Sequence, residues 1–323
     1  MSIVAGKNIL ITGGAGFIGS TLAGRLLEQN RVVVFDSFFR NALDSRTFKN
    51  HSNLEIIEGS VLDVDRLRVV MRRRPQIVVH CAAIAGIDTV IANPVETMRV
   101  NMVGSANVLE LASHEGVERV LCFSSSEVFG PQAFMASEAD PTTFGTVGEA
   151  RWTYAVSKLA VEHLAMAYFQ ERGLPVCVVR PFNIYGPGQV GGGAIRTFVL
   201  RALAGEPLQI HGDGTQIRAW CFIDDLIEGL MLAMSNPRAI GESFNLGNQR
   251  AVTTIYGLAH TVVSVLKSKS PIIFSEKSYV DVELRVPAVR KARDLLGFEA
   301  KVDLEEGIRR TAQAFASGSA QTP

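Results

Sequence analysis

The segment NILITGGAGFIGS, residues 8–20, decides the fold of this chain. An apolar run typical of a strand leads directly into a turn that carries Gly13, Gly16 and Gly19, and a stretch typical of a helix follows. Glycines in this context let the backbone turn tightly and let a diphosphate approach the N-terminus of the helix. The next strand, RVVVFD, ends in Asp36, where a carboxylate accepts hydrogen bonds from ribose hydroxyls. Because that carboxylate also repels a 2′-phosphate, this unit predicts a site for NAD rather than NADP.

The same alternation of strands and helices continues through the first 180 residues. Apolar strands separated by amphipathic helices predict a parallel sheet covered on both faces, the doubly wound α/β arrangement of a Rossmann-type domain. The expected strands are NILIT, RVVVFD, LEIIEG, QIVVHCAA, RVLCFSS and PVCVVRP, and the expected helices span residues 16–29, 64–74, 94–114 and 154–172.

After residue 180 the pattern becomes less regular. Glycine and proline cluster in YGPGQVGGG, and short strands then separate the helices. We expect a domain at 1–180 that binds NAD and carries the catalytic residues, and a smaller α/β lobe at 181–316 that mainly binds the substrate and is partly interleaved with the first domain. The small polar residues of 317–323 predict a disordered tail.

The composition excludes several classes of function. The 323 residues are 47% hydrophobic and carry 32 basic and 32 acidic side chains, which argues against a nucleic-acid or membrane-surface partner. No apolar run approaches the length of a membrane span, and the N-terminus lacks the pattern of a signal peptide, so we expect a cytoplasmic protein. The four cysteines lie far apart with no metal-binding spacing, which predicts buried thiols and no metal site.

A second motif lies in GEARWTYAVSKLAVEHL, residues 148–164. Tyr154 and Lys158 are four residues apart, so a helix would direct both side chains from the same face. An ammonium beside a phenol favours the phenolate and lowers the pKa of the tyrosine. Such a pair is either a base that works near neutral pH or an ordinary pair on the surface.

Six motifs occur in an order that resembles a known family: TGGAGFIGS, VVHCAAIAG, FSSSEVFG, YAVSK, RPFNIYGPGQ and GDGTQIRAW. Over nearly its whole length the chain resembles the extended short-chain dehydrogenases/reductases, in particular the nucleotide-sugar epimerase/dehydratase/decarboxylase group. The resemblance implies that Tyr154 removes a proton from the sugar C4 hydroxyl while hydride passes to NAD. It implies that Lys158 binds the nicotinamide ribose and, with the cationic nicotinamide, lowers the pKa of Tyr154. Ser125 or Ser126 would bring a hydroxyl to the same sugar oxygen, and Asn101 would brace the site.

The resemblance also implies which residues surround the dinucleotide. Asp63 and Val64, after the third strand, are expected to contact the adenine, although Asp63 also suits the N-cap of a helix. The remaining cofactor residues are expected to be Gly13, Gly16, Phe17, Ile18, Gly19, Asp36, Ala82, Ala83, Tyr154, Lys158 and Pro181.

Glu127 narrows the chemistry. A simple 4-epimerase requires no second acid or base, so a carboxylate beside the catalytic serines is expected where a further proton moves. Ser-Glu at this place resembles GDP-mannose 4,6-dehydratases and UDP-hexuronate decarboxylases, whereas dTDP-glucose 4,6-dehydratases have Asp-Glu. The alternative is that Glu127 lies in solvent at a strand end.

Four further residues are expected to bind the substrate. Arg151, in an Arg-Trp-x-Tyr segment, resembles the UDP-glucuronate decarboxylases and UDP-apiose/UDP-xylose synthases; its guanidinium would hold a C6 carboxylate or polarise the C4 oxygen, or else decorate the surface. Asn183, Arg218 and Arg285 resemble residues that bind the nucleotide diphosphate and ribose. Ala288 departs from the family, which usually has Asp there.

The reaction expected from these residues is decarboxylation of a UDP-hexuronate. A 4-epimerase is the next alternative and a 4,6-dehydratase the third, while a non-catalytic NAD sensor on the same fold is the contrasting class. Relatives commonly dimerise through a four-helix bundle, so we expect a homodimer through helices 94–114 and 154–172.

Overall fold

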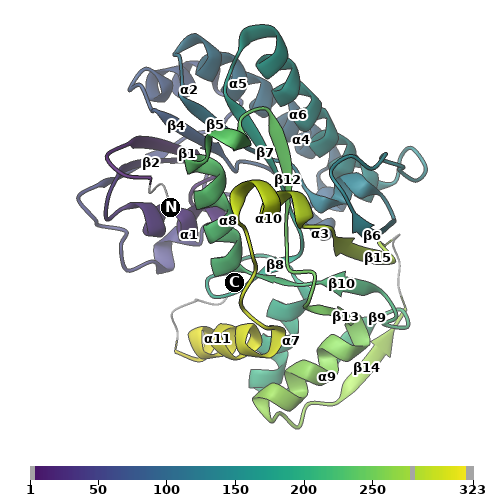
Figure 1. The fold of residues 1–323 in the computed structure, drawn as a ribbon. Coiled ribbons are helices and arrows are strands. Elements are labelled where there is room, and N and C mark those ends of the chain that lie inside the picture. Colours follow the sequence, from purple (N-terminus) through teal and green to yellow (C-terminus); the bar gives the residue numbers. More distant parts are fainter. Residues whose placement is uncertain (1–3, 277–280, 318–323) are drawn as a thin grey trace.

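The computed structural model describes residues 4–276 and 281–317, and its centre is a seven-stranded parallel sheet (Figure 1). The strand order is β12-β7-β5-β4-β1-β2-β3. Strands buried on both faces need apolar side chains in both directions, which explains the continuous apolar runs of the sequence. The strands are β1 (Asn8–Thr12), β2 (Arg31–Asp36), β3 (Leu54–Glu58), β4 (Ile77–His80), β5 (Arg119–Phe123), β7 (Val176–Pro181) and β12 (Glu242–Leu246).

The order of the sheet reverses beside β1, and this reversal positions the cofactor site. β1 pairs with β2 on one side and with β4 on the other, and its last residue, Thr12, lies opposite Phe35 and His80. In open α/β sheets a ligand binds outside the carboxyl ends of the strands where the order reverses. The doubly wound fold that the sequence predicted is confirmed.

Side chains that alternate along each strand reach two separate cores. Ile9 and Ile11 pack with Leu22 of α1 (Phe17–Leu26) and Leu226 of α8 (Ile223–Ser235) on one face. Leu10 packs on the opposite face, among side chains of three other helices. Those helices are α2 (Val64–Met71), α5 (Gly104–His114) and α6 (Ala150–Arg172), and α10 (Arg290–Leu296) lies beside α8 and β12.

The expected helix at 94–114 consists of three segments. α3 (Ile87–Ala92) precedes α4 (Pro94–Met98), a π-helical turn at Arg99–Val103 and then α5. The π-helical turn contains Asn101, whose Nδ2 donates to Ser157 Oγ at 2.9 Å and whose Oδ1 accepts from the N–H of Ile84 at 2.8 Å. π-Helical turns often occur at functional sites. Here Asn101 ties α6, which carries Tyr154, to the loop after β4, as the expected brace would.

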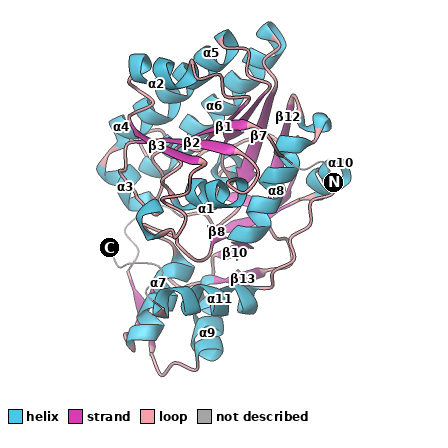
Figure 2. Ribbon diagram, turned by 90° about the vertical axis from the view of Figure 1, so that its left-hand side faces the viewer, coloured by secondary structure: helices cyan, strands magenta, loops and turns pink. Residues whose placement is uncertain are grey.

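The second part of the molecule lies below the large sheet (Figure 2). Its four-stranded sheet has the order β13-β10-β15-β6. The bounds are β6 (Gln132–Ala136), β10 (Ile217–Ala219), β13 (Val252–Thr254) and β15 (Leu284–Pro287), with the pairs β8 (Ile184–Tyr185) and β11 (Cys221–Phe222), and β9 (Leu208–His211) and β14 (Ile272–Ser275). The helices are α7 (Ala194–Ala204), α9 (Ile255–Leu266) and α11 (Leu304–Ala316), and single 3₁₀ turns lie at Leu43–Ser45, Ser126–Phe129 and Pro237–Ala239.

The chain crosses between the two parts more than once. β6 precedes residue 180 but joins the smaller sheet, while β12 follows it and completes the large one. The cut at residue 180 is therefore a division along the chain and does not separate the two parts in space. Of the tail at 317–323, only Ser317 belongs to the described residues.

Candidate active site

The turn after β1 brings three backbone segments into close approach. Gly13 has a φ of 71°, in the left-handed region, and a Cβ there would lie 2.5 Å from the backbone nitrogen of Ala82. A Cβ on Gly19 would lie 2.5 Å from the carbonyl oxygen of Gly13. Gly16 is the N-cap of α1 and makes no side-chain capping bond, so the first N–H groups of that helix can receive an anion.

Asp36 lies at the end of β2 with its carboxylate fixed by backbone donors. Oδ2 accepts from the N–H of Ala15 at 2.9 Å, and Oδ1 accepts from the N–H of Phe38 at 2.7 Å. Burial raises the pKa of Asp36, while these hydrogen bonds lower it. The backbone N–H groups of Ser37 and Gly16 contribute to the same lowering, so the backbone fixes this carboxylate at the end of β2.

These residues line a cleft of about 540 Å³ whose shape and donors fit NAD. The lining includes the glycine turn after β1, Asp36 at the end of β2, and the loop after β4. Of the expected cofactor residues, the lining contains Gly13, Gly16, Phe17, Ile18, Gly19, Asp36, Ala82 and Ala83.

Beside β3, the structure shows the helix cap that the sequence offered as the alternative for Asp63. Asp63 is the N-cap of α2, and its Oδ1 accepts from the N–H of Arg66 at 3.0 Å. Gly59, Ser60 and Val61 line the cleft instead, directly after β3. Their position at the carboxyl end of a strand was the available signal. The adenine contact of Asp63 and Val64 stays a prediction.

Lys158 lies inside the protein and Tyr154 is half-buried in the wall of a second cleft, so the two are not an ordinary pair on the surface. Lys158 is 3% exposed, its Nζ donates to the carbonyl oxygen of Phe123 at 2.9 Å, and it lies 6.0 Å from the centre of the Tyr154 ring. Burial lowers the pKa of Lys158 to about 8. The two side chains therefore have the proximity that the helical spacing predicted.

The pKa of Tyr154 differs from the sequence prediction. In the protein alone, burial raises it to about 12; a hydrogen bond with Ser125 lowers it and the charge of Glu127 raises it further. The ammonium of Lys158 is directed to a backbone carbonyl and does not outweigh burial. A lowered pKa at Tyr154 therefore requires positive charge beyond that of Lys158.

The structure distinguishes the two candidate serines. Ser125, 9% exposed, is the hydrogen-bond partner of Tyr154, and its Oγ also accepts from the N–H of Glu127 at 3.2 Å. Ser126 is buried in the following 3₁₀ turn. Both serines line that second cleft, which adjoins the cofactor cleft. Ser125 therefore fits the expected hydroxyl beside the sugar oxygen better than Ser126 does.

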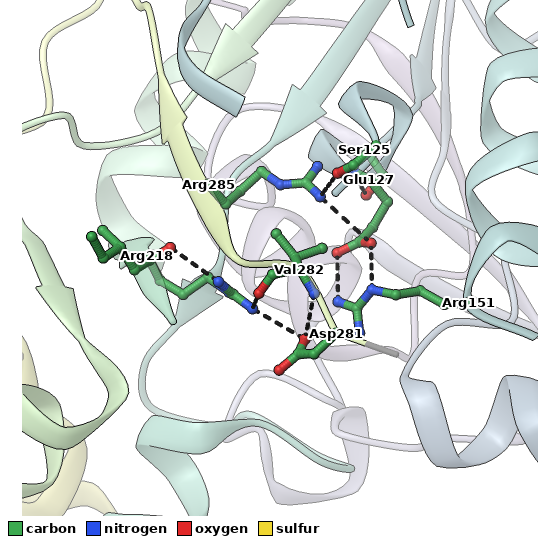
Figure 3. A network of polar contacts seen from close by, with 9 residues as sticks. Ser125, Glu127, Arg151, Arg218, Asp281, Val282 and Arg285 are labelled. Carbon is green, nitrogen blue, oxygen red and sulfur yellow. Dashed lines mark hydrogen bonds and ion pairs between the residues drawn. The ribbon is translucent and has the colours of Figure 1, made fainter. Parts of the chain in front are cut away.

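Glu127 points into the protein rather than into bulk solvent. Arg151 donates to it twice, from Nε to Oε2 at 3.1 Å and from Nη2 to Oε1 at 3.2 Å (Figure 3). Arg285 Nη2 lies 3.8 Å from Oε2 on the other side. Arg151 lines the second cleft, and its guanidinium is occupied by this carboxylate and by Asp281, whose Oδ1 lies 3.0 Å from Nη1.

Asp281 also belongs to the site, although its sequence context did not predict it. Its Oδ1 also lies 3.1 Å from Arg218 Nη2, so one oxygen joins two arginines that were assigned to the substrate (Figure 3). Its position four residues before Arg285 gave no motif by which to find it. The network thus contains three guanidinium groups and two carboxylates.

Arg218 and Arg285 lie side by side because β10 and β15 pair in parallel with these two residues in register. Arg218 donates to the carbonyl oxygens of Val282 and Ile217. Arg285 is 1% exposed and donates from Nη2 to the carbonyl oxygen of Gly130. Its Nε and Nη1 are buried without a hydrogen-bond partner in the described chain, and burial lowers its pKa to about 10.

The second cleft, of about 400 Å³, adjoins the cofactor cleft. Asn183 lies in it with a φ of 43°, and its Nδ2 donates to the carbonyl oxygen of Ala219 at 2.8 Å. The two clefts share Phe17, Ile18, Ala85, Gly86, Gln189 and Gly192. The second cleft is also lined by Ser125, Ser126, Glu127, Arg151, Tyr154, Pro181 and Asn183.

Among the described residues, no group of three His, Cys, Asp or Glu side chains is arranged to hold a metal ion. No helix in the described part of the chain has the length and apolar character to cross a membrane.

A dinucleotide cleft adjoins a second cleft that is lined by Tyr154 and Ser125, and the buried Lys158 lies 6.0 Å from the tyrosine ring. This arrangement defines an NAD-dependent enzyme that oxidises an alcohol. The chain belongs to the NAD dependent epimerase/dehydratase family, whose model matches residues 9–247.

Named relatives specify the substrates of similar enzymes. The chain is 34% identical to the UDP-N-acetyl-alpha-D-glucosaminuronate decarboxylase of Bacillus cytotoxicus, over 96% of this chain and 98% of that protein. It is 35% identical to UDP-glucuronic acid decarboxylase 1 of Danio rerio, over 96% and 72%. The structure of UDP-glucuronic acid 4-epimerase from Bacillus cereus, in complex with UDP-glucuronic acid and NAD, is similar with a TM-score of 0.88, 27% identity and coverage of 96% and 99%. The predictions of family, NAD and nucleotide-sugar chemistry are confirmed, and the non-catalytic sensor is set aside.

Proposed function

We propose that this enzyme decarboxylates a UDP-hexuronate after oxidising it at C4. Arg285 supports the proposal most directly. Arg285 is buried behind the lining of the second cleft, where its Nη2 lies 3.8 Å from Oε2 of the lining residue Glu127. Its Nε and Nη1 have no hydrogen-bond partner in the described chain. Buried unpaired donors are costly, so such nitrogens are expected to receive an anionic group of the substrate. The sequence suggested that Arg151 holds the C6 carboxylate or polarises the C4 oxygen. Because Glu127 and Asp281 already occupy that guanidinium, we assign the carboxylate to Arg285.

The reaction would begin at Tyr154. Bound NAD supplies the acceptor for the C4 hydride and later returns it. Tyr154 would take the proton from O4, and the hydrogen bond with Ser125 favours the phenolate form that this requires. Lys158 would hold the cofactor ribose beside the tyrosine.

Oxidation at C4 makes the C6 carboxylate that of a β-keto acid. When CO₂ leaves, the bonding electrons move toward the C4 oxygen, where Tyr154 and Ser125 are placed to stabilise the developing charge. C5 then gains a proton. Glu127 lines the same cleft and is held in one orientation by Arg151, so we assign to it the transfer of a proton from water to C5.

4-Epimerisation of the same substrate is the second candidate, because the solved UDP-glucuronic acid 4-epimerase has a closely similar fold. The two reactions, and 4,6-dehydration, differ in product mass. Incubation with UDP-glucuronate, UDP-N-acetylglucosaminuronate and UDP-glucose, followed by mass spectrometry, tests the proposal. Loss of the mass of CO₂ supports it; an unchanged mass with altered retention indicates the epimerase, and loss of water the dehydratase.

We also propose that the enzyme is a homodimer through the layer formed by α3, α4, the π-helical turn and α6. Adjoining elements of this layer expose apolar side chains, with Ile91 46%, Val95 73%, Val103 51% and Val156 40% exposed. Such a surface favours a second apolar surface over water. Light scattering at micromolar concentration should give twice the mass of the chain, and Val95→Asp should give a monomer.

A further inference from the structure

Arg40 lies in the lining of the cofactor cleft, in the loop after β2 and four residues beyond Asp36. Its Nη2 donates to Thr89 Oγ1 in α3 at 2.6 Å. A Cβ on Gly86 would lie 3.1 Å from this nitrogen, and a Cβ on Gly191 would lie 3.0 Å from the central guanidinium carbon. The guanidinium therefore joins the loop after β2 to α3 and to the glycine-rich loop that both clefts share.

The charge of Arg40 is unusual for its surroundings. Of the side chains that line the described cleft, two are acidic, Asp36 and Glu96, and Arg40 is the basic one. A dinucleotide brings a diphosphate with two negative charges into this cleft. The N-terminus of α1 provides only partial positive charge, and the guanidinium of Arg40 would add a full one.

The guanidinium also has donors to spare. It has five N–H groups, and the hydrogen bond to Thr89 uses one of them. The side chain is half-buried, so an ion pair formed there is less screened by solvent than one on the surface.

We propose that Arg40 binds the diphosphate of the dinucleotide and retains the cofactor in its cleft between turnovers. Retention suits an enzyme in which the hydride taken from the sugar returns to the same sugar. The inference rests on the NAD dependence of the family and not on decarboxylation, because cofactor binding requires no sugar substrate.

The test compares ligands with and without a diphosphate. Binding of NAD, ADP and adenosine to cofactor-stripped protein is measured by calorimetry for the wild type, Arg40→Ala and Arg40→Gln; the Gln variant removes the charge but keeps a donor toward Thr89. We expect both variants to bind NAD and ADP roughly 10- to 100-fold more weakly and adenosine nearly as well as the wild type. Added salt should weaken ADP binding to the wild type more than to either variant.

Arg46 provides the matched control, since it lies in the same segment and also contacts the glycine-rich loop. Its guanidinium donates to Ser20 and Thr21 of α1, adjoins Gly188, and is not among the side chains that line the described cleft. Arg46→Ala should therefore leave the ratio of ADP to adenosine affinity unchanged. If Arg40→Ala and Arg40→Gln weaken ADP and adenosine by the same factor, or leave NAD binding and its salt dependence intact, Arg40 only supports the loop and the proposal is wrong.

Discussion

Replacing Arg285 by glutamine should change which sugar the enzyme binds. The variant removes the buried Nε and Nη1 donors that we assign to the C6 carboxylate, while Glu127 keeps both of its hydrogen bonds from Arg151. A buried charge-assisted contact is worth about 1.5–3 kcal/mol, which corresponds to roughly 10- to 150-fold in affinity. We expect UDP-glucuronate to lose that factor and UDP-glucose, which has no carboxylate, to lose much less.

The assay is the ratio of the dissociation constants of UDP-glucuronate and UDP-glucose, measured on NAD-loaded protein. A ratio cancels any general loss of stability, which matters because Arg285 is 1% exposed and donates to Gly130. Arg218→Gln is the matched control. Its guanidinium already bonds Asp281, Val282 and Ile217, so this variant should weaken both sugars equally through their common diphosphate. Equal losses in Arg285→Gln would refute the assignment of Arg285 to the carboxylate.

Four other substitutions test separate parts of the account. Tyr154→Phe should lower the rate by a factor on the order of 10²–10⁴ while NAD still binds, and near-normal turnover would remove Tyr154 from the mechanism. Glu127→Gln should slow release of product in a stopped-flow trace but spare the initial rise of NADH absorbance; an equal effect on both would contradict its role in the second proton transfer. Asp36→Ala should weaken NAD relative to NADP in a binding titration, and an unchanged preference would show that another residue selects the cofactor. Burial lowers the pKa of His80 from 6.5 to about 3, so between these pH values only the unfolded state gains this proton, and the protein loses stability as the pH falls. His80→Gln should therefore reduce the pH dependence of the free energy of unfolding by about 1.4 kcal/mol per pH unit. An unaltered pH dependence would assign this effect to other groups.

Local chemistry explains which features the sequence predicted well. The turn at Gly13 has to follow a strand and open a helix, so the sequence alone locates β1, α1 and the end of β2. Tyr154 and Lys158 share a helix face because four residues make about one turn. The expected strands agree with those observed to within a few residues at either end.

Contacts between distant parts of the chain could not be predicted in this way. Arg151 meets Asp281 across the two parts of the molecule, and no spacing in the sequence reports that pairing. Arg40 likewise lies beside Gly191, which is far away in the sequence, and no local pattern predicts that contact. The pKa of Tyr154 depends on how deeply the folded chain buries the phenol. The four-residue spacing from Lys158 does not specify that burial.

Release of the C6 carbon tests the central claim most directly. UDP-glucuronate labelled with ¹³C at C6 is incubated with the NAD-loaded enzyme and followed by NMR. We predict that the label appears as bicarbonate, in amounts equal to the UDP-pentose formed. Persistence of the label in a UDP-hexuronate inverted at C4 would contradict decarboxylation and identify the enzyme as a 4-epimerase.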